Sequence, residues 1–460
     1  MTRAKSTNER KKGRARRSLT ATVLTAGLAV IAGAVFVMTF DANRYRPMIE
    51  QKFLEAVGCP IRIGHMGLGW RNGLTVECEG VSLLGGGIWP PAPVLQLESF
   101  SAKMRVAPLF RRRIEISSLV FRGPRLHLTR YQDGRLNVIG LGPIAAPVAV
   151  AKEIAAPSPA VPITIDSLRI VNGALHVDDA HSTPPYRLTL TRVNVRLQPI
   201  ASGVPVNVEL DGALASDAPN LHLSARVRWP DATQPGSVEQ LNIALDRVPL
   251  ARIVPEVLAN EPHLEGQLSL EAHGVISTLD PLQISHAVAA SGRLSLTEGK
   301  IVHLNVLREV FQRLSMLPRL NERLKTALPR ASLQRLEASD TVIGPIEFPW
   351  TIRQGVLEVD NLRVDAEELE LSGTGWVGFP GAMRFHGILR LDPGLSQALI
   401  AGVNELDRLT GAEGRLEFPL SIRGQFPRVA ILPDLDVIAT KLLISRVQGI
   451  LGNILQQTLE

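Results

Sequence analysis

A strict two-residue alternation of apolar and polar side chains constrains the fold of this chain more than any other feature. In residues 221–229, LHLSARVRW, every odd position is apolar and every even position is polar. Successive side chains of an extended strand point to opposite faces, so this segment has one dry face and one wet face. Similar runs occupy residues 95–98, 114–121, 125–130, 163–170, 186–197, 204–210, 264–272 and 367–372. The pattern predicts a mainly β protein of antiparallel strands.

Glycine-containing pairs interrupt several of these runs. Asn172-Gly173 and Glu298-Gly299 are residue pairs typical of tight turns. Three stretches therefore follow one scheme of a strand, a Gly-containing turn and a second strand, and we expect each to be a β-hairpin: 165–179, 293–306 and 351–365.

Helical patterns are few. Residues 44–57, RYRPMIEQKFLEAV, predict a short amphipathic helix, and 303–328 and 395–409 predict helical insertions between strands. The last segment, 434–460, is the most amphipathic, because its apolar residues recur at helical spacing opposite polar ones. We expect this C-terminal helix to close one end of the sheet or to dock on a membrane or partner, although a simple packing helix fits the same pattern.

The N-terminus predicts a membrane anchor. Residues 1–17 carry eight Lys or Arg and one acid, whereas the whole chain has a net charge of only +6. Residues 19–40 contain no charge, and 22 helical residues span about 33 Å, enough for a hydrocarbon core of ~30 Å. The charge asymmetry predicts a cytoplasmic N-terminus and an exported remainder. A cleaved signal peptide is the alternative, but the apolar run continues beyond the A-x-A-like site at 32–34.

Charge and composition divide the rest of the chain. Beyond residue 17 acidic and basic residues nearly balance, so the pI of 9.6 does not indicate nucleic-acid binding. Residues 140–162 are rich in Ala and Pro and read as a linker. The predicted organisation is a basic tail (1–18), a transmembrane helix (19–40), an N-terminal β domain (41–139), the linker (140–162), a larger β region (163–433) and the C-terminal helix (434–460).

The sequence contains no convincing catalytic or metal motif, and we expect neither an enzyme nor a cofactor. Gly373, Gly375 and Gly378 match GxGxxG, but a strand rather than a helix follows, so no phosphate site is predicted. The cluster of His176, Asp178, Asp179 and His181 suggests either a metal site or, more simply, a hairpin end rich in turn-forming residues.

Two cysteines are present, Cys59 and Cys78. They flank the predicted turn at 71–73 at unequal distances, so we do not expect them to lie opposite each other.

The dry face of the predicted sheet needs a cover, and another sheet, a helix or an apolar ligand would each provide one. Aromatic residues make up only 4% of the chain, which favours an open groove that holds lipid over a closed sandwich. The cleanest strands predict that nine residues line one continuous apolar face: Val193, Val195, Leu197, Val206, Val208, Leu210, Leu221, Leu223 and Val227. Arg111, Arg112 and Arg113 lie in a predicted turn and are either a solvated loop or a contact for anionic lipid headgroups.

Residues 44–138 resemble the N-terminal domain of the AsmA-like family of envelope proteins. The resemblance is carried by Arg46-Pro47, CPIRIG at 59–64, Leu68, GLTV at 73–76, VSL at 81–83, Pro108-Leu109, IEI at 114–116, Leu119, Gly123-Pro124, Leu126, Leu128, Arg130, Asp133-Gly134 and Asn137. Val138 departs from the pattern, because the family often has an aromatic residue there. The C-terminal half is similar to the AsmA C-terminal region in the 292–306 and 373–395 segments and the final helix.

The resemblance implies a fold and a function. The fold is an elongated, taco-like antiparallel β-groove with an apolar interior, anchored in the inner membrane with its bulk in the periplasm. The function is phospholipid transport that supports the outer membrane, with phospholipid, the inner membrane and an envelope protein as partners. A structural role in outer-membrane protein assembly, with an exposed strand edge that templates a client strand, is the alternative.

Overall fold

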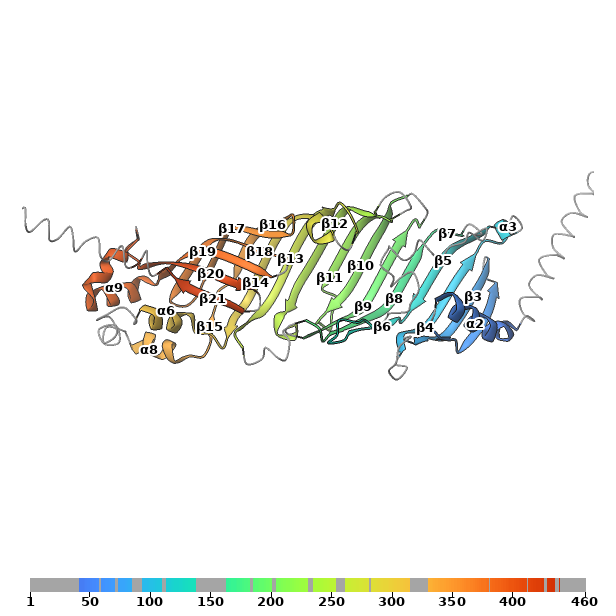
Figure 1. Cartoon of the computed structure of the whole chain (residues 1–460), viewed down its shortest axis with the longest axis horizontal. Coiled ribbons are helices and arrows are strands. Elements are labelled where there is room, and N and C mark those ends of the chain that lie inside the picture. Colours follow the sequence, from blue (N-terminus) through green and yellow to red (C-terminus); the bar gives the residue numbers. More distant parts are fainter. Residues whose placement is uncertain are drawn as a thin grey trace, which may run out of the picture. The chain divides into compact units, whose positions relative to one another are not determined.

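The computed structural model confirms that the chain is mainly β with a few short helices (Figure 1). It describes residues 41–434 and 438 except for 58, 71–72, 85–92, 110–112, 138–162, 183–184, 201–203, 231–234, 254–260, 281–282, 315–329, 380, 412 and 426–427. The chain divides into two compact units. Unit 1 comprises Met1–Leu128 and Leu136–Gly173, and unit 2 comprises Thr129–Arg135 and Ala174–Glu460. Each is described here by itself.

Unit 1 begins with a short 3-10 helix and an α-helix, followed by strands that pack an apolar face. The elements are η1 (Ala42–Tyr45), α2 (Arg46–Val57), β1 (Ile61–Arg62), β2 (His65–Trp70), β3 (Leu74–Leu84), β4 (Pro93–Met104), α3 (Val106–Leu109), β5 (Ile114–Arg122), β6 (Arg125–Arg130), β7 (Ile163–Ile165) and β8 (Leu168–Asp179). The last residues of β6, from Thr129, and of β8, from Ala174, belong to unit 2. Strands β2 to β5 pair in sequence order and antiparallel. Strands β2 and β3 form a hairpin on either side of the predicted turn at 71–73, with Trp70 opposite Leu74.

One part of unit 1 departs from the antiparallel prediction. Strand β7 and the start of β8 run parallel to β5, with Ile114 opposite Ile163 and Leu119 opposite Leu168. A parallel pair needs a long crossover between its strands, and the segment that includes residues 138–162 supplies one. Strands on both sides of that segment therefore belong to one unit.

Unit 2 is an antiparallel meander in which most strands pair with the next one along the chain. Its strands are β9 (Tyr186–Gln198), β10 (Val206–Leu214), β11 (Leu221–Arg228), β12 (Ser237–Pro249), β13 (His263–Ile276), β14 (Val288–Val302), β15 (Thr341–Val342), β16 (Ile346–Arg353), β17 (Val356–Asp365), β18 (Leu369–Gly378), β19 (Ala382–Leu391), β20 (Glu417–Gln425) and β21 (Arg428–Pro433). Both β15 and β16 pair with β14.

Short helices join some of these strands. They are η2 (Leu250–Arg252), α5 (Ile284–Ala287), α6 (Val306–Leu314), α8 (Arg330–Glu337), α9 (Pro393–Gly402) and η4 (Asn404–Leu409). Helix α6 lies within the predicted 303–328 insertion, and α9 with η4 confirms the helical prediction for 395–409.

Two of the three predicted hairpins are wrong. The 351–365 stretch is a hairpin, with Arg353 opposite Val356 and positive φ at both Gln354 (51°) and Gly355 (77°). In contrast, 168–179 and 288–302 are continuous strands in which only Asn172 (φ 55°) or Glu298 (φ 54°) adopts positive φ. A two-residue turn of type I′, as at Gln354-Gly355, needs two such residues, whereas the single one in each of these strands marks a bulge that the strand passes through.

Three predicted segments lie largely or wholly outside the described residues: the transmembrane helix at 19–40, the linker at 140–162 and most of the C-terminal helix at 434–460. Among the described residues, no helix combines the length and the apolar content needed to cross a bilayer. In the C-terminal segment, Ile438 is fully buried in an apolar cluster with residues of α6, α9 and η4.

Candidate functional site

The nine predicted groove residues lie on one face of three neighbouring strands. Val208 of β10 lies opposite Leu197 of β9 and Ala225 of β11. Leu210 lies opposite Val195 and Leu223, and Val206 lies opposite Val227. Leu221 and Val193 share this face through the two-residue period of their strands. We call this surface, with its continuation below, the apolar face.

The apolar face continues across strands that the sequence prediction did not include. From Leu223, directly opposed residues continue through Ile243, Ala272, Gly292 and Trp350 in β12, β13, β14 and β16. A second row runs from Leu221 through Leu245, Leu270, Leu294 and Phe348. The alternation in 264–272 already indicated which residues of β13 face inward. Aligning them with residues of the other strands requires knowing which strands pair.

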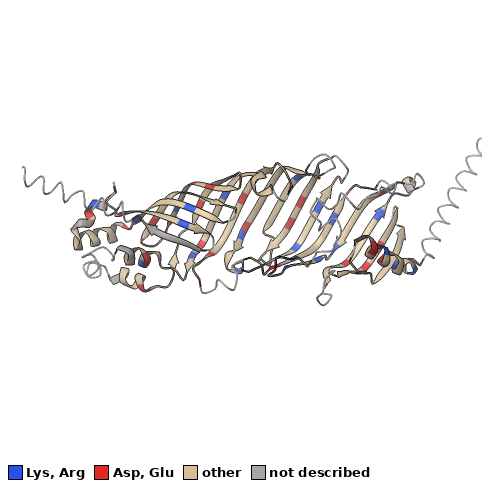
Figure 2. Cartoon of the chain, in the orientation of Figure 1, with Lys and Arg blue, Asp and Glu red and all other residues tan. Residues whose placement is uncertain are grey.

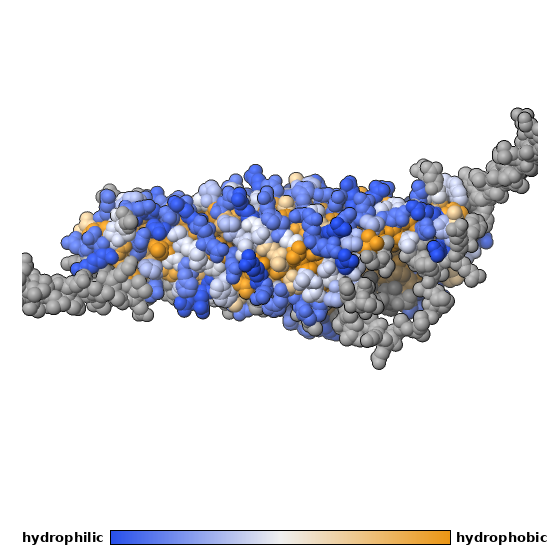
Figure 3. Space-filling view, turned by 90° about the horizontal axis from the view of Figure 1, so that it is seen from above, coloured by the Kyte–Doolittle hydropathy of each residue, from blue (hydrophilic) through white to orange (hydrophobic). Residues whose placement is uncertain are grey.

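The cover over the apolar face differs between its two ends. From β10 to β13 most inward residues, such as Val208, Leu223 and Leu270, are only partly buried, whereas Val206 at the start of β10 is fully buried. On β19 and β20, in contrast, Leu389 and Phe418 are each 1% exposed, because residues of α6, α9 and η4 pack over them. The apolar face is therefore open over β10–β13 and covered at β18–β20. Figure 3 shows hydrophobic side chains between hydrophilic ones on the side of the molecule turned to the viewer.

Small residues let the strands approach each other closely in the middle of the apolar face, on β13 and β14. A methyl group added at Gly292 would overlap the backbone oxygen of Glu271 and lie 2.7 Å from the Trp350 ring. One added at Gly274 would overlap the backbone of Ala289 and lie 2.7 Å from the Ala290 Cβ. Glycine in a strand interior commonly marks such an approach, where the sheet bends. These positions keep the middle of the apolar face free of bulk.

The opposite, outer face of the unit 2 sheet is charged. Cross-strand ion pairs join Arg196 to Glu209 at 3.6 Å, Arg226 to Glu239 at 3.2 Å and Arg293 to Glu347 at 2.9 Å. Figure 2 shows Lys and Arg interspersed with Asp and Glu along the strands. The sheet of unit 2 thus has one wet face and one apolar face, as the alternation predicts.

A denser charged cluster lies on the outer face of β17–β20. The Glu370 carboxylate accepts hydrogen bonds from Arg415 at 2.8 Å, Arg390 at 3.2 Å and Arg363 at 3.3 Å. Burial alone would raise the pKa of Glu370, but the hydrogen bond from Arg415 and the three positive charges lower that pKa overall. Because Glu370 and these three arginines satisfy one another's charges and hydrogen bonds, this cluster stabilises the sheet.

The two motifs that suggested chemistry are structural. Gly373 and Gly375 lie inside strand β18, opposite Gly387 and Phe385, as expected for strand glycines. Asp179 Oδ1 accepts the backbone N–H groups of His181 at 2.9 Å and Ser182 at 3.0 Å, which makes the end of β8 a turn. Within the described part of the chain, no three His, Cys, Asp or Glu side chains gather closely enough to hold a metal ion.

Cys59 and Cys78 are buried in unit 1, and the structure places no disulfide between them. Cys78 lies opposite Met66 in the β2–β3 pair, which confirms that the cysteines do not face each other across the turn. Burial raises the pKa of the Cys78 thiol.

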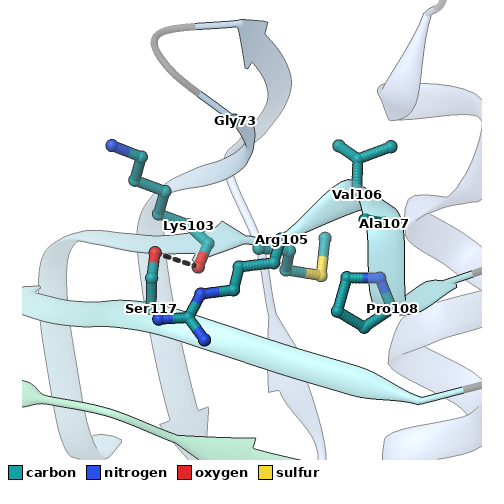
Figure 4. A pocket seen from close by; sticks show the side chains of 8 residues that line it. Gly73, Lys103, Arg105, Val106, Ala107, Pro108 and Ser117 are labelled. Carbon is teal, nitrogen blue, oxygen red and sulfur yellow. Dashed lines mark hydrogen bonds between the residues drawn. The ribbon is translucent and has the colours of Figure 1, made fainter.

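Of the three predicted headgroup-binding arginines, Arg111 and Arg112 lie outside the described residues. Arg113 is exposed just before β5, and its backbone N–H donates to the Pro108 oxygen at 3.1 Å. A hollow beside it is lined by Gly73, Lys103, Met104, Arg105, Val106, Ala107, Pro108 and Ser117 (Figure 4). The Arg105 guanidinium is held by Asp166 at 2.7 Å and Glu115 at 3.3 Å, so two acids offset its charge.

Residues 13–229 match the model of the AsmA family. Over this stretch, slightly less than half of the chain, the sequence is similar to the AsmA family. The match begins before the predicted transmembrane segment, covers all the described residues of unit 1 and ends directly after β11 of unit 2. Among curated proteins no relative matches the chain. The likeness of the C-terminal half to AsmA proteins lies beyond the matched residues and remains a resemblance.

The AsmA segment includes the first three strands of the apolar face. Six of the nine predicted groove residues belong to β9 and β10, the other three belong to β11, and all lie within 13–229. The strands from β12 onward extend the same face with the same alternation, outside the matched part. The family match and a large sheet with one apolar face are compatible with a role in lipid transport or in the cell envelope.

Proposed function

We propose that this AsmA-family chain carries phospholipid along the apolar face, anchored in the inner membrane through residues 19–40 with its bulk in the periplasm. The observation that carries the proposal is the open stretch of apolar side chains on β10–β13, backed by a charged outer face. An apolar surface of this kind needs a cover, and acyl chains would provide it. Each methylene taken out of water contributes about 0.8 kcal/mol, so no catalytic residue or cofactor is needed.

The rows of opposed residues suggest how a lipid would lie. Acyl chains would run across successive strands, over Leu223, Ile243 and Ala272, while the headgroup stays at the solvent-exposed margin. The small residues at Gly274 and Gly292 would give the chains room at the bend of the sheet. The covered end at β18–β20 would limit how far a lipid penetrates.

An assembly role for outer-membrane proteins is the second candidate. It needs a strand edge that can pair with a client, and β21 pairs only with β20 in the part of the chain that the structure describes. However, β21 has six residues and ends at Pro433, which has no N–H to offer a client strand. Lipid carriage therefore has the stronger support.

The test is a charge placed on the apolar face. In Val208→Arg the guanidinium would lie where acyl chains pass, and burying an unpaired charge there is costly. Because the face is open, the long side chain can reach water, so the variant should fold. We expect its bound phospholipid, measured by mass spectrometry of the purified protein, to fall at least several-fold.

The matched control is Ser224→Arg. Ser224 is exposed on the outer face of the neighbouring strand, directly opposite Glu209, so an arginine there should leave bound lipid unchanged. A folded Val208→Arg protein with its full complement of lipid would refute carriage on this part of the sheet. Unfolding of Val208→Arg, with Ser224→Arg intact, would indicate a closed core in place of a groove.

A further inference from the structure

Helix α2 of unit 1 presents an apolar stripe to solvent. Four exposed large hydrophobic side chains fall within ten residues of sequence, Tyr45, Met48, Ile49 and Leu54, and Met48 is 54% exposed. Tyr45, Met48 and Ile49 follow the i, i+3, i+4 spacing that places side chains on one side of a helix. Lys52 follows on the same side one turn later and ends the apolar stripe with a cation.

The other side of α2 is fixed to the sheet. The Arg46 Nη1 donates to the Gly64 backbone oxygen at 3.0 Å, and the Glu50 carboxylate accepts the Ile63 N–H at 2.8 Å. Asn43 in η1 accepts the Met66 N–H at 2.9 Å, and Ala42 is buried in the unit 1 core. Helix α2 contacts β1 of unit 1. The orientation of the helix, and therefore of its stripe, is set by these contacts.

The position of α2 in the chain indicates what the stripe contacts. Tyr45 lies five positions after Phe40, the last residue of the 22-residue apolar segment. Fully extended, five residues reach at most ~18 Å, and the 3-10 helix η1 shortens this distance. The interfacial layer of a bilayer is itself about 5–7 Å deep on each side. If residues 19–40 span the membrane, α2 starts at the membrane surface.

We propose that α2 docks on the bilayer, with Tyr45, Met48 and Ile49 inserted at the interface. The proposal rests on the membrane anchoring in the proposed function and adds a second contact to it. The residue types fit this place, because tyrosine concentrates at membrane interfaces and apolar neighbours insert below the headgroups. Arg44 and Lys52 have side chains that are 84% and 76% exposed and pair with Asp41 at 3.9 Å and Glu55 at 3.0 Å, so anionic headgroups would compete with these acids for the two cations. Two contacts, an anchor and a docked helix, would fix the orientation of unit 1 on the membrane.

The test uses the full chain in nanodiscs of phosphatidylethanolamine and phosphatidylglycerol. An environment-sensitive fluorophore is attached in the Met48→Cys variant, and the control is Glu77→Cys, at an exposed position on β3. Labelling of the unsubstituted chain reports any reaction at Cys59 or Cys78. We expect the emission at position 48 to rise at least threefold over that at position 77 and to be quenched by lipids that carry a nitroxide near the headgroup.

Flotation and bound lipid, measured on the same samples, separate the possible failures. If the chain floats with membranes but position 48 behaves like position 77, the docking of α2 is refuted and the anchor stands. If the chain does not float, both the membrane anchor and the docking of α2 are refuted. Lipid carriage on the apolar face is tested separately by the amount of bound lipid. A rise in emission without quenching by nitroxide lipids would mean that protein covers the stripe, and would also refute the docking.

Discussion

Truncation of one leucine at each end of the apolar face distinguishes an open groove from a closed core. Leu223 lies on the open part, partly buried, and Leu389 is 1% exposed under the helices. Replacing leucine by alanine removes three carbon atoms, and at about 0.8 kcal/mol each a fully buried leucine loses about 2.4 kcal/mol of transfer free energy. A closed site adds a cavity term, which brings the usual cost to 2–5 kcal/mol.

The two positions should therefore respond differently. We expect Leu389→Ala to lower the free energy of unfolding by about 3–4 kcal/mol, because the cluster around it cannot collapse fully into the space. We expect Leu223→Ala to cost about 1–1.5 kcal/mol, because part of the side chain already contacts water and no sealed cavity forms. Chemical denaturation of delipidated protein in mild detergent, followed by far-UV circular dichroism, measures both values.

Equal costs at the two positions, within about 0.5 kcal/mol, would refute the open groove. They would mean that β10–β13 are covered as completely as β18–β20. Bound phospholipid provides an independent reading, since it should fall in Leu223→Ala and stay unchanged in any folded Leu389→Ala protein.

The charged outer face gives two further predictions. Glu370→Gln leaves three arginines around a neutral amide and should lower the free energy of unfolding by about 1–3 kcal/mol. The control is Glu413→Gln: the Glu413 side chain is 75% exposed, so this change should alter the free energy of unfolding by less than about 0.5 kcal/mol. Chemical denaturation measures both values. Asp340 accepts hydrogen bonds from Lys300, at 2.6 Å, and from the His303 N–H, and these lower the pKa of its carboxyl from 3.8 to about 2. The stability that the ionised Asp340 contributes is therefore present above pH 4 and is lost as the pH falls from about 4 to 2. Asp340→Asn should flatten the pH dependence of the denaturation midpoint in that window, and a variant with the unaltered acid slope would contradict this assignment.

The sequence predicts the apolar face well where local pattern alone decides it. Val206, Val208 and Leu210 alternate with polar residues, and alternate residues of a strand point to the same face whichever strands pair with it. The same argument was available for Leu268 and Leu270 in β13. What the sequence could not supply was the alignment of distant strands, such as Gly292 with Trp350, because pairing partners are set by the folded sheet.

Bulges and turns mark a second limit. Asn172-Gly173, Glu298-Gly299 and Gln354-Gly355 look alike as residue pairs, yet only the last is a hairpin turn. The difference lies in the φ angle of the glycine, which is positive only at Gly355. Since glycine adopts both signs of φ readily, the neighbouring strands decide the outcome.

The covering helices mark a third limit. The sequence predicts a helix at 395–409, and α9 and η4 confirm it, but nothing in that segment shows which part of the sheet it covers. The structure places Leu399 and Leu406 on the apolar residues of β19 and β20. The distinction between an open and a covered part of the apolar face therefore emerged only from tertiary packing.

The most direct test of the central claim is to measure what occupies the apolar face. The full chain would be extracted from membranes in mild detergent, purified, and analysed by native mass spectrometry, with Val208→Arg and Ser224→Arg prepared in parallel. Lipid carriage predicts at least one phospholipid per chain in the unaltered protein and in Ser224→Arg, and its loss in a folded Val208→Arg. Unaltered protein that binds no phospholipid, or equal lipid in all three proteins, would contradict it.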